Sequence, residues 1–243
     1  MRRAKIMMKN GIDVSKYQGN IAWKQVKDSG IDFAIIKAGG SDDGFYTDPT
    51  YEANYKNAKA VGMPVGAYYI VGPYCVSKED GIADAKRFLK MLQGKTFEYP
   101  VYIDLELTSP TTKTGTTDAV IAFCKTMEAS GYFCGIYASD ISGFKDRLEL
   151  SRLKTRALWV ASYGGKPTYT KSYGIWQKSD KGKVPGIVGD VDLDECYVDY
   201  PAIIKSRGDN GFPKPTAPAP TKKLMKVTVE YDDHTYSGLL EEQ

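Results

Sequence analysis

Short apolar runs alternate with amphipathic segments from Gly11 to Leu193. The run Phe33-Ala34-Ile35-Ile36-Lys37 is almost continuously apolar, which is typical of a parallel strand buried on both faces. By this pattern we predict strands at 12–14, 33–37, 65–71, 100–106, 132–137, 158–161, 174–177 and 188–193. Helices are predicted between them at 23–29, 49–60, 77–92 and 117–130.

The order of these elements indicates the fold class. A strand, a helix and a second strand follow one another repeatedly, and such connections form right-handed parallel crossovers. Eight strands favour a closed barrel over an open sheet, because no Gly-rich phosphate loop follows the first strand. The last strands leave little sequence for helices between them. We therefore predict an α/β fold, an irregular TIM-like (β/α) barrel with eight strands and fewer helices.

The composition changes after Arg207. Four prolines follow with Lys, Thr and Ala between them, at Pro213, Pro215, Pro218 and Pro220, which is typical of an extended linker. Alternating apolar and polar residues beyond it predict a β-hairpin, which is too small to be stable alone. It should dock on the barrel or on another copy of the chain. The predicted boundaries are a leader at 1–10, a catalytic barrel at 11–207, a Pro-rich linker at 208–223 and a hairpin tail at 224–243.

Composition and charge limit the classes of partner that we expect for this chain. The chain has 33 basic and 30 acidic residues, and this net charge of +3 is too small to indicate a nucleic-acid partner. No window approaches the ~20 apolar residues of a membrane span. The first ten residues are basic but lack the ~7–15 apolar residues of an export signal, so we expect synthesis in the cytoplasm without a signal peptide. The 18 tyrosines suit a sugar-binding groove, although any single Tyr is more simply a strand residue.

Histidine and cysteine usage excludes several hydrolase chemistries. The single histidine, His234, lies in the tail, so nucleophiles activated by histidine and histidine-ligated zinc sites are nearly excluded. The cysteines have no metal-ligand spacing, and we expect buried free thiols at Cys75, Cys124, Cys134 and Cys196. We expect neither a metal nor a cofactor.

Carboxylates at strand ends are the strongest chemical signal. Asp104 and Glu106 are two residues apart, so on a strand they face the same way, and the C-terminal ends of barrel strands carry active sites. Two close carboxyls raise the pKa of one of them, which creates the general acid that glycoside cleavage needs. A salt-bridged surface pair would explain an isolated Asp-x-Glu. However, Asp13 also ends the first predicted strand and Asp192 ends the last, and these two strands are neighbours in a closed barrel.

Eight ordered sequence blocks resemble the glycoside hydrolase family 25 lysozymes, the Chalaropsis-type muramidases. The first block is Gly11-Ile12-Asp13-Val14-Ser15-Lys16-Tyr17-Gln18-Gly19. The others are Phe33-Ala34-Ile35-Ile36-Lys37-Ala38, Val65-Gly66-Ala67-Tyr68, Tyr102-Ile103-Asp104-Leu105-Glu106, Gly135-Ile136-Tyr137, Trp159-Val160-Ala161, Ile175-Trp176-Gln177 and Val191-Asp192-Leu193-Asp194. The resemblance covers residues 11–205 in the family's order.

This resemblance implies cleavage of the β-1,4 bond between N-acetylmuramic acid and N-acetylglucosamine in bacterial peptidoglycan. It implies that Glu106 is the proton donor and that Asp104 is its partner, either as a nucleophile or by orienting the substrate's acetamido group. Asp13 and Asp192 would be further acids of the catalytic groove. Substrate-binding residues would be Lys37, Tyr68, Tyr137, Tyr163, Trp176 and Gln177.

The chain departs from the family at the third strand, where Tyr69-Ile70 replaces the His-Phe of many members. This departure concerns the shape of a subsite and not the acid pair. A phage or prophage endolysin, released to the wall by a holin, is the expected context. Two alternatives remain open: a wall-binding barrel of a phage particle that has lost catalysis, and a chitinase-like hydrolase, although no extended Asp-x-x-Asp-x-Asp-x-Glu run precedes Glu106.

Overall fold

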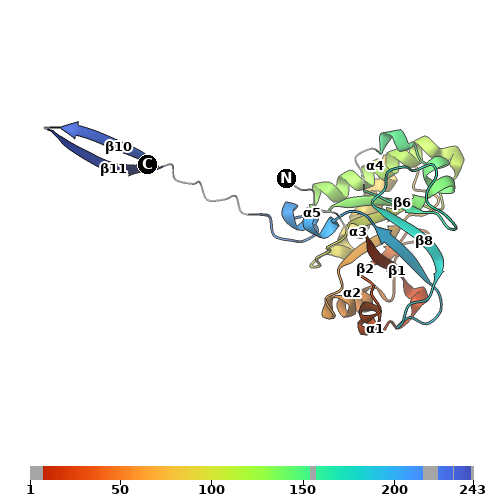
Figure 1. Cartoon of the computed structure of the whole chain (residues 1–243). Helices are drawn as coiled ribbons and strands as arrows, with labels where there is room; N and C mark the ends of the chain where they lie inside the picture. The colour runs from red at the N-terminus through yellow and green to blue at the C-terminus, as the bar shows by residue number, and fades with distance from the viewer. Residues whose placement is uncertain (1–7, 154–156, 216–223, 232, 242–243) are drawn as a thin grey trace.

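Eight strands close into a barrel in the computed structural model, which describes residues 8–153, 157–215, 224–231 and 233–241. They are β1 (Lys9–Val14), β2 (Phe33–Gly40), β4 (Val65–Ile70), β5 (Val101–Asp104), β6 (Cys134–Ser139), β7 (Ala157–Ala161), β8 (Ile175–Gly182) and β9 (Val191–Cys196). The first seven of these strands, β1, β2 and β4 to β8, run parallel around the ring, and β9 closes it by pairing antiparallel with β8 and β1. The predicted irregular α/β barrel is confirmed (Figure 1).

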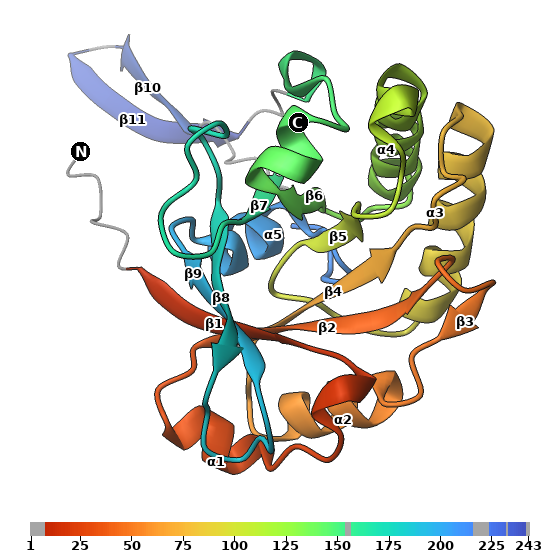
Figure 2. The ribbon, with the colours of Figure 1, turned by 90° about the vertical axis from the view of Figure 1, so that its right-hand side faces the viewer.

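Helices cover only part of this barrel. The α-helices are α1 (Trp23–Asp28), α2 (Tyr51–Ala60), α3 (Lys78–Leu92), α4 (Lys113–Ala129) and α5 (Tyr200–Arg207). Shorter elements are β3 (Tyr46–Thr47), η1 (Lys16–Gln18), η2 (Pro110–Thr112), η3 (Asp140–Lys145) and η4 (Leu150–Arg152). Figure 2 shows α2, α3 and α4 along the outside of β2, β4 and β5, whereas the described residues 162–174 and 183–190, which connect β7, β8 and β9, contain no α-helix. None of the described helices is both long and apolar enough to cross a membrane.

The alternation of side chains along each strand separates two apolar layers. Ala34 and Ile36 of β2 pack outward against the helices, whereas Phe33 and Ile35 pack into the barrel interior. Every residue of β2 is buried, as expected for a strand covered on both faces. Residues that point inward near the C-terminal strand ends therefore reach the open mouth of the barrel.

The other end of the barrel is closed by residues that we predicted to be linker. Asn210 is fully buried, its Nδ2 donates to the carbonyls of Phe97 and Tyr99, and its Oδ1 accepts from Phe133 N at 2.7 Å. These contacts satisfy backbone groups that would otherwise be buried without partners. The folded body thus extends at least to Phe212, which packs on the interior cluster, and the predicted linker start at residue 208 is wrong.

Two strand boundaries also differ from prediction. β1 begins at Lys9 and pairs with β9 from there, so two residues of the predicted leader are part of the barrel. The last strand begins at Val191 and not at residue 188, because Gly186 and Gly189, both with positive φ, turn the chain before it. Its antiparallel direction brings the start of β9, and not its end, to the mouth of the barrel.

Strands β10 (Leu224–Tyr231) and β11 (His234–Glu241) form a separate two-stranded antiparallel sheet. Among the described residues, neither strand pairs with a strand of the barrel. The predicted docking or self-association of this tail stays a prediction. Residues 1–7 of the predicted leader and 216–223 of the predicted linker lie outside the described residues.

The four cysteines are buried free thiols, as predicted. Cys124 on α4 and Cys134 on β6 place their sulfur atoms 3.6 Å apart. Burial raises the pKa of the Cys134 thiol well above its ordinary value, so it behaves as a small core residue.

Candidate active site

A pocket of about 310 Å³ opens at the C-terminal ends of the parallel strands, and we call it the acid pocket. It contains all four predicted acids, Asp13, Asp104, Glu106 and Asp192. Five of the six predicted binding residues also line it, namely Lys37, Tyr68, Tyr137, Tyr163 and Gln177. The strand alternation explains this gathering, because each of these strand residues shares the inward face of its strand with the interior cluster.

Asp104 and Glu106 differ in depth. Asp104 is the last residue of β5 and is only 4% exposed, whereas Glu106 lies two residues beyond the strand at the solvent-exposed edge of the pocket. Burial raises the pKa of Asp104 well above its ordinary value, and the Glu106 charge adds to this rise. Burial also raises the pKa of Glu106, against the lowering effects of the Tyr137 hydroxyl and of Lys37. Both carboxyls therefore hold protons to higher pH than usual.

Lys37 supplies positive charge beside this pair. It extends inward from β2 and is 9% exposed, and its Nζ lies 5.8 Å from the ring centroid of Tyr68 and 5.7 Å from that of Tyr46. Its charge lowers the pKa of both Asp104 and Glu106, which opposes the effect of burial. The aromatic rings hold this cation in place through cation–π contacts.

Asp13 and Asp192 face each other across the β1–β9 pairing. Asp13 is 5% exposed, and its Oδ2 accepts a 2.7 Å hydrogen bond from Gln177 Nε2. Burial, followed by the charges of Asp194 and Asp192, raises the pKa of Asp13 well above its ordinary value. Burial also raises the pKa of Asp192, whereas its contact with Asp13 lowers it. We infer that the Asp13 carboxyl retains its proton and donates a hydrogen bond to the Asp192 carboxylate.

Asp194 is a further buried acid next to the pocket, and we did not predict that it contributes to the site. It lies beneath Asp13 and Asp192 on β9, is 1% exposed, and its Oδ1 accepts from Trp159 Nε1 at 2.8 Å. Burial raises the pKa of Asp194 to about 8. The sequence carried a signal for it, since Asp194 follows Asp192 at the same two-residue spacing as Glu106 follows Asp104.

Gln177 fixes the orientation of several groups at once. Its Oε1 accepts from the hydroxyls of Tyr137 and Tyr163, both at 2.8 Å, while its Nε2 donates to Asp13. This pattern leaves one amide orientation that satisfies all three bonds. The Trp159 ring, 4.4 Å from that of Tyr137 between centroids, covers the floor beneath them. The hydrogen-bonded side of the pocket is therefore preformed.

Trp176 is not among the residues that line the acid pocket, contrary to our prediction. It precedes Gln177 on β8, so its side chain points to the opposite face of that strand. Its Nε1 donates to the carbonyl of Ser162 at 2.9 Å. We therefore replace it with Trp159, whose place on the inward face follows from the same alternation.

The acid pocket offers a specific chemistry. Acids with raised pKa values supply protons near neutral pH, and a second carboxyl stabilises positive charge that develops on a reacting sugar. Aromatic rings provide flat surfaces for a ring-shaped polar substrate. Among the described residues, no group of three or more His, Cys, Asp or Glu side chains is arranged to hold a metal ion.

Comparisons with known proteins agree with this geometry. Residues 12–187 match the family described as Glycosyl hydrolases family 25. The chain is 33% identical over 186 residues to the autolytic lysozyme of Clostridium acetobutylicum, covering 76% of this chain and 55% of that protein. It is 31% identical over 205 residues to lysozyme M1 of Streptomyces globisporus, covering 75% of this chain and 65% of that protein. The chain thus spans less than two thirds of the length of these two curated relatives.

A solved structure supports the same assignment. The crystal structure of the CTP1L endolysin superposes with a TM-score of 0.70 at 30% sequence identity, covering 81% of this chain and 69% of that chain. The family match runs from β1 to the turn before β9, so it contains seven of the eight barrel strands and every residue that lines the acid pocket except Asp192. The chain therefore belongs to glycosyl hydrolase family 25.

Proposed function

We propose that this chain is a peptidoglycan hydrolase, an N-acetylmuramidase that cleaves the β-1,4 bond between N-acetylmuramic acid and N-acetylglucosamine. The observation that carries this proposal is the acid pair of raised pKa, one member at the pocket floor and one at its edge. The family membership and the likeness to an autolytic lysozyme and to lysozyme M1 support the choice of substrate.

Glu106 is the proton donor in this proposal. It lines both the acid pocket and an adjoining space of about 380 Å³, which we call the leaving-group hollow and which Arg147 and Ser139 also line. A donor at this border reaches the oxygen of a bond that runs from one space into the other. Its raised pKa keeps the carboxyl protonated until the leaving group needs the proton.

Asp104 orients the acetamido group of the reacting sugar, so that the acetamido oxygen and not the protein attacks the anomeric carbon. Its Oδ1 is buried and has no hydrogen-bond partner among the described residues. A buried carboxylate oxygen without a partner is costly, and the N–H of an acetamido group would satisfy it. Direct attack by Asp104 is the alternative, and it would leave a covalent sugar–enzyme ester.

Two measurements test the reaction. Digestion of purified peptidoglycan should release fragments whose new reducing ends are N-acetylmuramic acid, and Glu106→Gln should release none at a comparable rate. New N-acetylglucosamine ends, or cleavage of chitin in preference to peptidoglycan, would contradict the muramidase assignment. Replacing the acetamido group of the reacting sugar by a hydroxyl should abolish turnover, whereas undiminished turnover would favour direct attack by Asp104.

Location and assembly belong to the same proposal. We propose that the protein acts on the bacterial wall after holin-type release, which its likeness to an endolysin supports.

We also propose that the β10–β11 hairpin mediates self-association, because a two-stranded sheet has little stability alone. Sedimentation of the full chain and of a chain ending at Phe212 should differ in oligomeric state. Monomers in both cases would exclude this role for the hairpin.

A further inference from the structure

A cavity of about 470 Å³ lies between β3, α2 and α3, and we call it the basic pocket. Thr47 on β3 and Lys90 on α3 both line it. Among the described residues, none that lines the basic pocket also lines the acid pocket or the leaving-group hollow. The basic pocket therefore lies outside the groove to which we assign the cleavage reaction.

Positive charge gathers in the basic pocket. Its lining includes one carboxylate, Glu52, and three cations, which are Arg87, Lys90 and Lys95. The whole chain is nearly balanced, with 33 basic and 30 acidic residues, so this local excess does not follow from composition. Lys90 is exposed and has no ion-pair partner within the described part of the chain. The basic pocket thus attracts anions.

One of these cations is fixed before any ligand arrives. The Lys95 side chain is only 14% exposed, and its Nζ pairs with Glu52 Oε1 at 2.9 Å and donates to the Met91 carbonyl oxygen at 3.2 Å. The ring centroids of Tyr51 and Tyr55 lie 5.3 Å and 5.7 Å from this ammonium. An ammonium group has three donors, so Lys95 retains one for a ligand.

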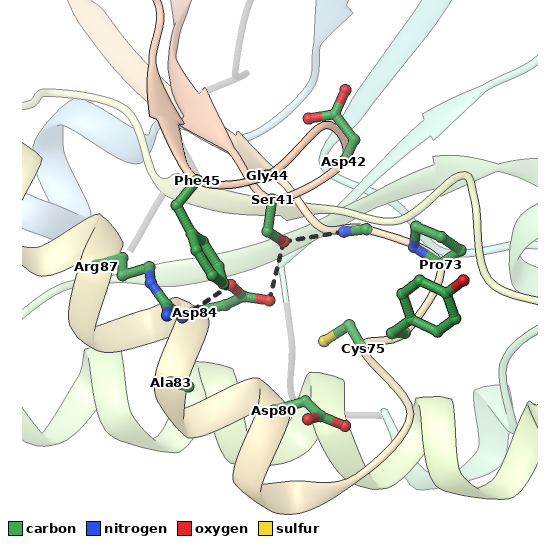
Figure 3. Close-up of a pocket in the computed structure, with 12 residues that line it drawn as sticks. Ser41, Asp42, Gly44, Phe45, Pro73, Cys75, Asp80, Ala83, Asp84 and Arg87 are labelled. Atoms are coloured by element: carbon green, nitrogen blue, oxygen red, sulfur yellow. Dashed lines mark hydrogen bonds and ion pairs between the residues drawn. The ribbon is translucent and has the colours of Figure 1, made fainter.

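Arg87 and Phe45 form a second fixed part of the basic pocket. The Arg87 guanidinium lies over the Phe45 ring, 3.1 Å from its centroid, and pairs with Asp84 at 3.7 Å (Figure 3). Asp84 also accepts from Ser41 Oγ and from the Tyr69 hydroxyl, both at 3.1 Å. Because Asp84 partly neutralises the Arg87 charge, the two lysines provide most of the attraction for an anion.

The donors that remain favour a phosphate over a carboxylate. A guanidinium matches the planar carboxylate in a bidentate pair, but Arg87 already pairs with Asp84. Ammonium groups bind phosphate as point charges, and a phosphodiester keeps its negative charge throughout the neutral pH range. The Phe45 ring, which is 62% exposed, and Met91 offer apolar contacts for the carbon chain between two phosphates.

We propose that the basic pocket binds a phosphodiester group of a polyol phosphate polymer attached to the bacterial wall. Contact with a polymer that lies beside the glycan would retain the protein on the wall between cleavage events and leave the acid pocket free. This assignment takes from the proposed function only the location of the protein on the wall, because the contact itself requires no cleavage.

Binding of a fluorescently labelled glycerol phosphate hexamer to the full chain, measured by anisotropy, tests this site. Lys90→Glu should weaken the Kd about tenfold, because a repulsion replaces an attraction. Thr47→Glu places an anion on the β3 side and should also weaken the Kd, whereas Lys90→Arg keeps the charge and should not. Equal Kd values for the parent and Lys90→Glu would overturn the proposal whatever the reaction is.

Lys125→Glu separates the pocket from net charge. Lys125 is exposed near the C-terminal end of α4, as Lys90 is near that of α3, and it does not line the basic pocket. Both substitutions change the net charge equally, but Lys125→Glu should leave the Kd within about twofold of the parent. Equal losses in the two variants would indicate attraction by overall charge and overturn the proposal. If Lys90→Glu has a lower Tm than the parent, the comparison is made with Thr47→Glu instead.

Other phosphate sources give different outcomes. In a Glu106→Gln protein, which prevents digestion, binding should be tighter to intact walls than to walls stripped of phosphodiester polymers by hydrofluoric acid. Adding Lys90→Glu should remove this difference. Inorganic phosphate that displaces the hexamer at equal phosphorus concentration would indicate a site for a free ion and overturn the proposal. Phosphatidylglycerol vesicles that bind more tightly than the hexamer would indicate a membrane surface and also overturn it.

The hexamer distinguishes a wrong binding site from a wrong reaction. If the protein cleaves no glycan, a Kd that Lys90→Glu weakens and Lys125→Glu does not weaken still supports the basic pocket. If the hexamer does not bind the parent, the basic pocket has no such ligand, and the release of N-acetylmuramic acid ends still decides the muramidase assignment.

Discussion

The acid pocket has two sides that use the same sequence spacing in different surroundings. On one side, Asp104 and Glu106 lie beside Lys37 and open toward the leaving-group hollow. On the other, Asp192 and Asp194 adjoin Asp13 at the β1–β9 pairing, where Gln177 and Trp159 donate to the buried carboxyls. Burial raises carboxyl pKa values on both sides.

A raised pKa alone therefore does not identify the catalytic acid. The β1–β9 carboxyls are bound by uncharged donors, which favours a fixed arrangement of protons and side chains. The pair after β5 has a nearby cation and an open edge, so its protonation can change during a reaction cycle. We therefore assign the chemical step to the side with Asp104 and Glu106, and the positioning of side chains to the side at the β1–β9 pairing.

The largest expected effect is that of Asp104→Asn on turnover. Loss of the carboxylate that stabilises the reacting acetamido group should lower kcat about a thousandfold. Thermal unfolding at pH 7 should not show a lower Tm, because burial already disfavours the charged form of Asp104. Asp13→Asn on the other side replaces a carboxyl that we infer is protonated and should cost only about tenfold. Equal losses in the two variants would remove the distinction between the two sides.

Lys37→Met should shift the pH dependence of kcat/KM. The Lys37 charge lowers the pKa of both Asp104 and Glu106, so its removal raises both values. The acid limb and the alkaline limb should then move together to higher pH. Lys24→Met, which removes a surface lysine paired with Asp28, is the matched control and should leave the profile in place. A profile that keeps its midpoints in Lys37→Met would show that this cation does not act on the pair.

Asp194→Asn should change stability more than activity. Burial raises the pKa of Asp194 to about 8, against roughly 4 in the unfolded chain, so the folded parent binds this proton more tightly. The parent's free energy of unfolding therefore falls as pH rises from about 4 to 8. The free energy of unfolding of the Asp194→Asn variant does not fall for this reason, because asparagine does not titrate.

The variant should unfold at least about 4 °C above the parent at pH 8 and converge with it near pH 4, while activity stays within about threefold. Other charged and titratable groups that act on this carboxyl or feel its charge, namely Asp13, Asp192, Lys178, Tyr102 and Cys196, remain in both proteins. Asp194→Leu, which cannot accept from Trp159, should lose stability at every pH. A pH-independent difference between parent and Asp194→Asn would contradict the assignment of the proton.

The smallest effect is expected from removing the tail. A chain ending at Phe212 should cleave soluble fragments with kcat/KM within about twofold of the parent, because the acid pocket is built entirely from residues before that point. A chain ending at Arg207 removes Asn210 and its three side-chain hydrogen bonds, so its Tm should fall by several degrees, on the order of 5 °C or more. Loss of turnover in the first chain would make the tail part of the catalytic groove.

Strand periodicity predicted much of the barrel and of the acid pocket. The continuous apolar run at β2 predicted a strand buried on both faces, and the two-residue spacing predicted that strand-end acids meet. The same rule applied consistently would have included Asp194 and Trp159 and excluded Trp176. The antiparallel direction of β9 and the packing of Asn210 were missed, because both depend on contacts between distant parts of the chain that no local pattern records.

The turnover of Glu106→Gln on peptide-free glycan tests the central claim most directly. We predict a kcat at least about a thousandfold below that of the parent, with unchanged Tm and unchanged substrate binding, because only the transferable proton is lost. The alkaline limb of the pH profile should disappear with it, since burial raises the pKa of this carboxyl and sets that limb. A Glu106→Gln protein that clears walls as fast as the parent would contradict the assignment of the proton donor.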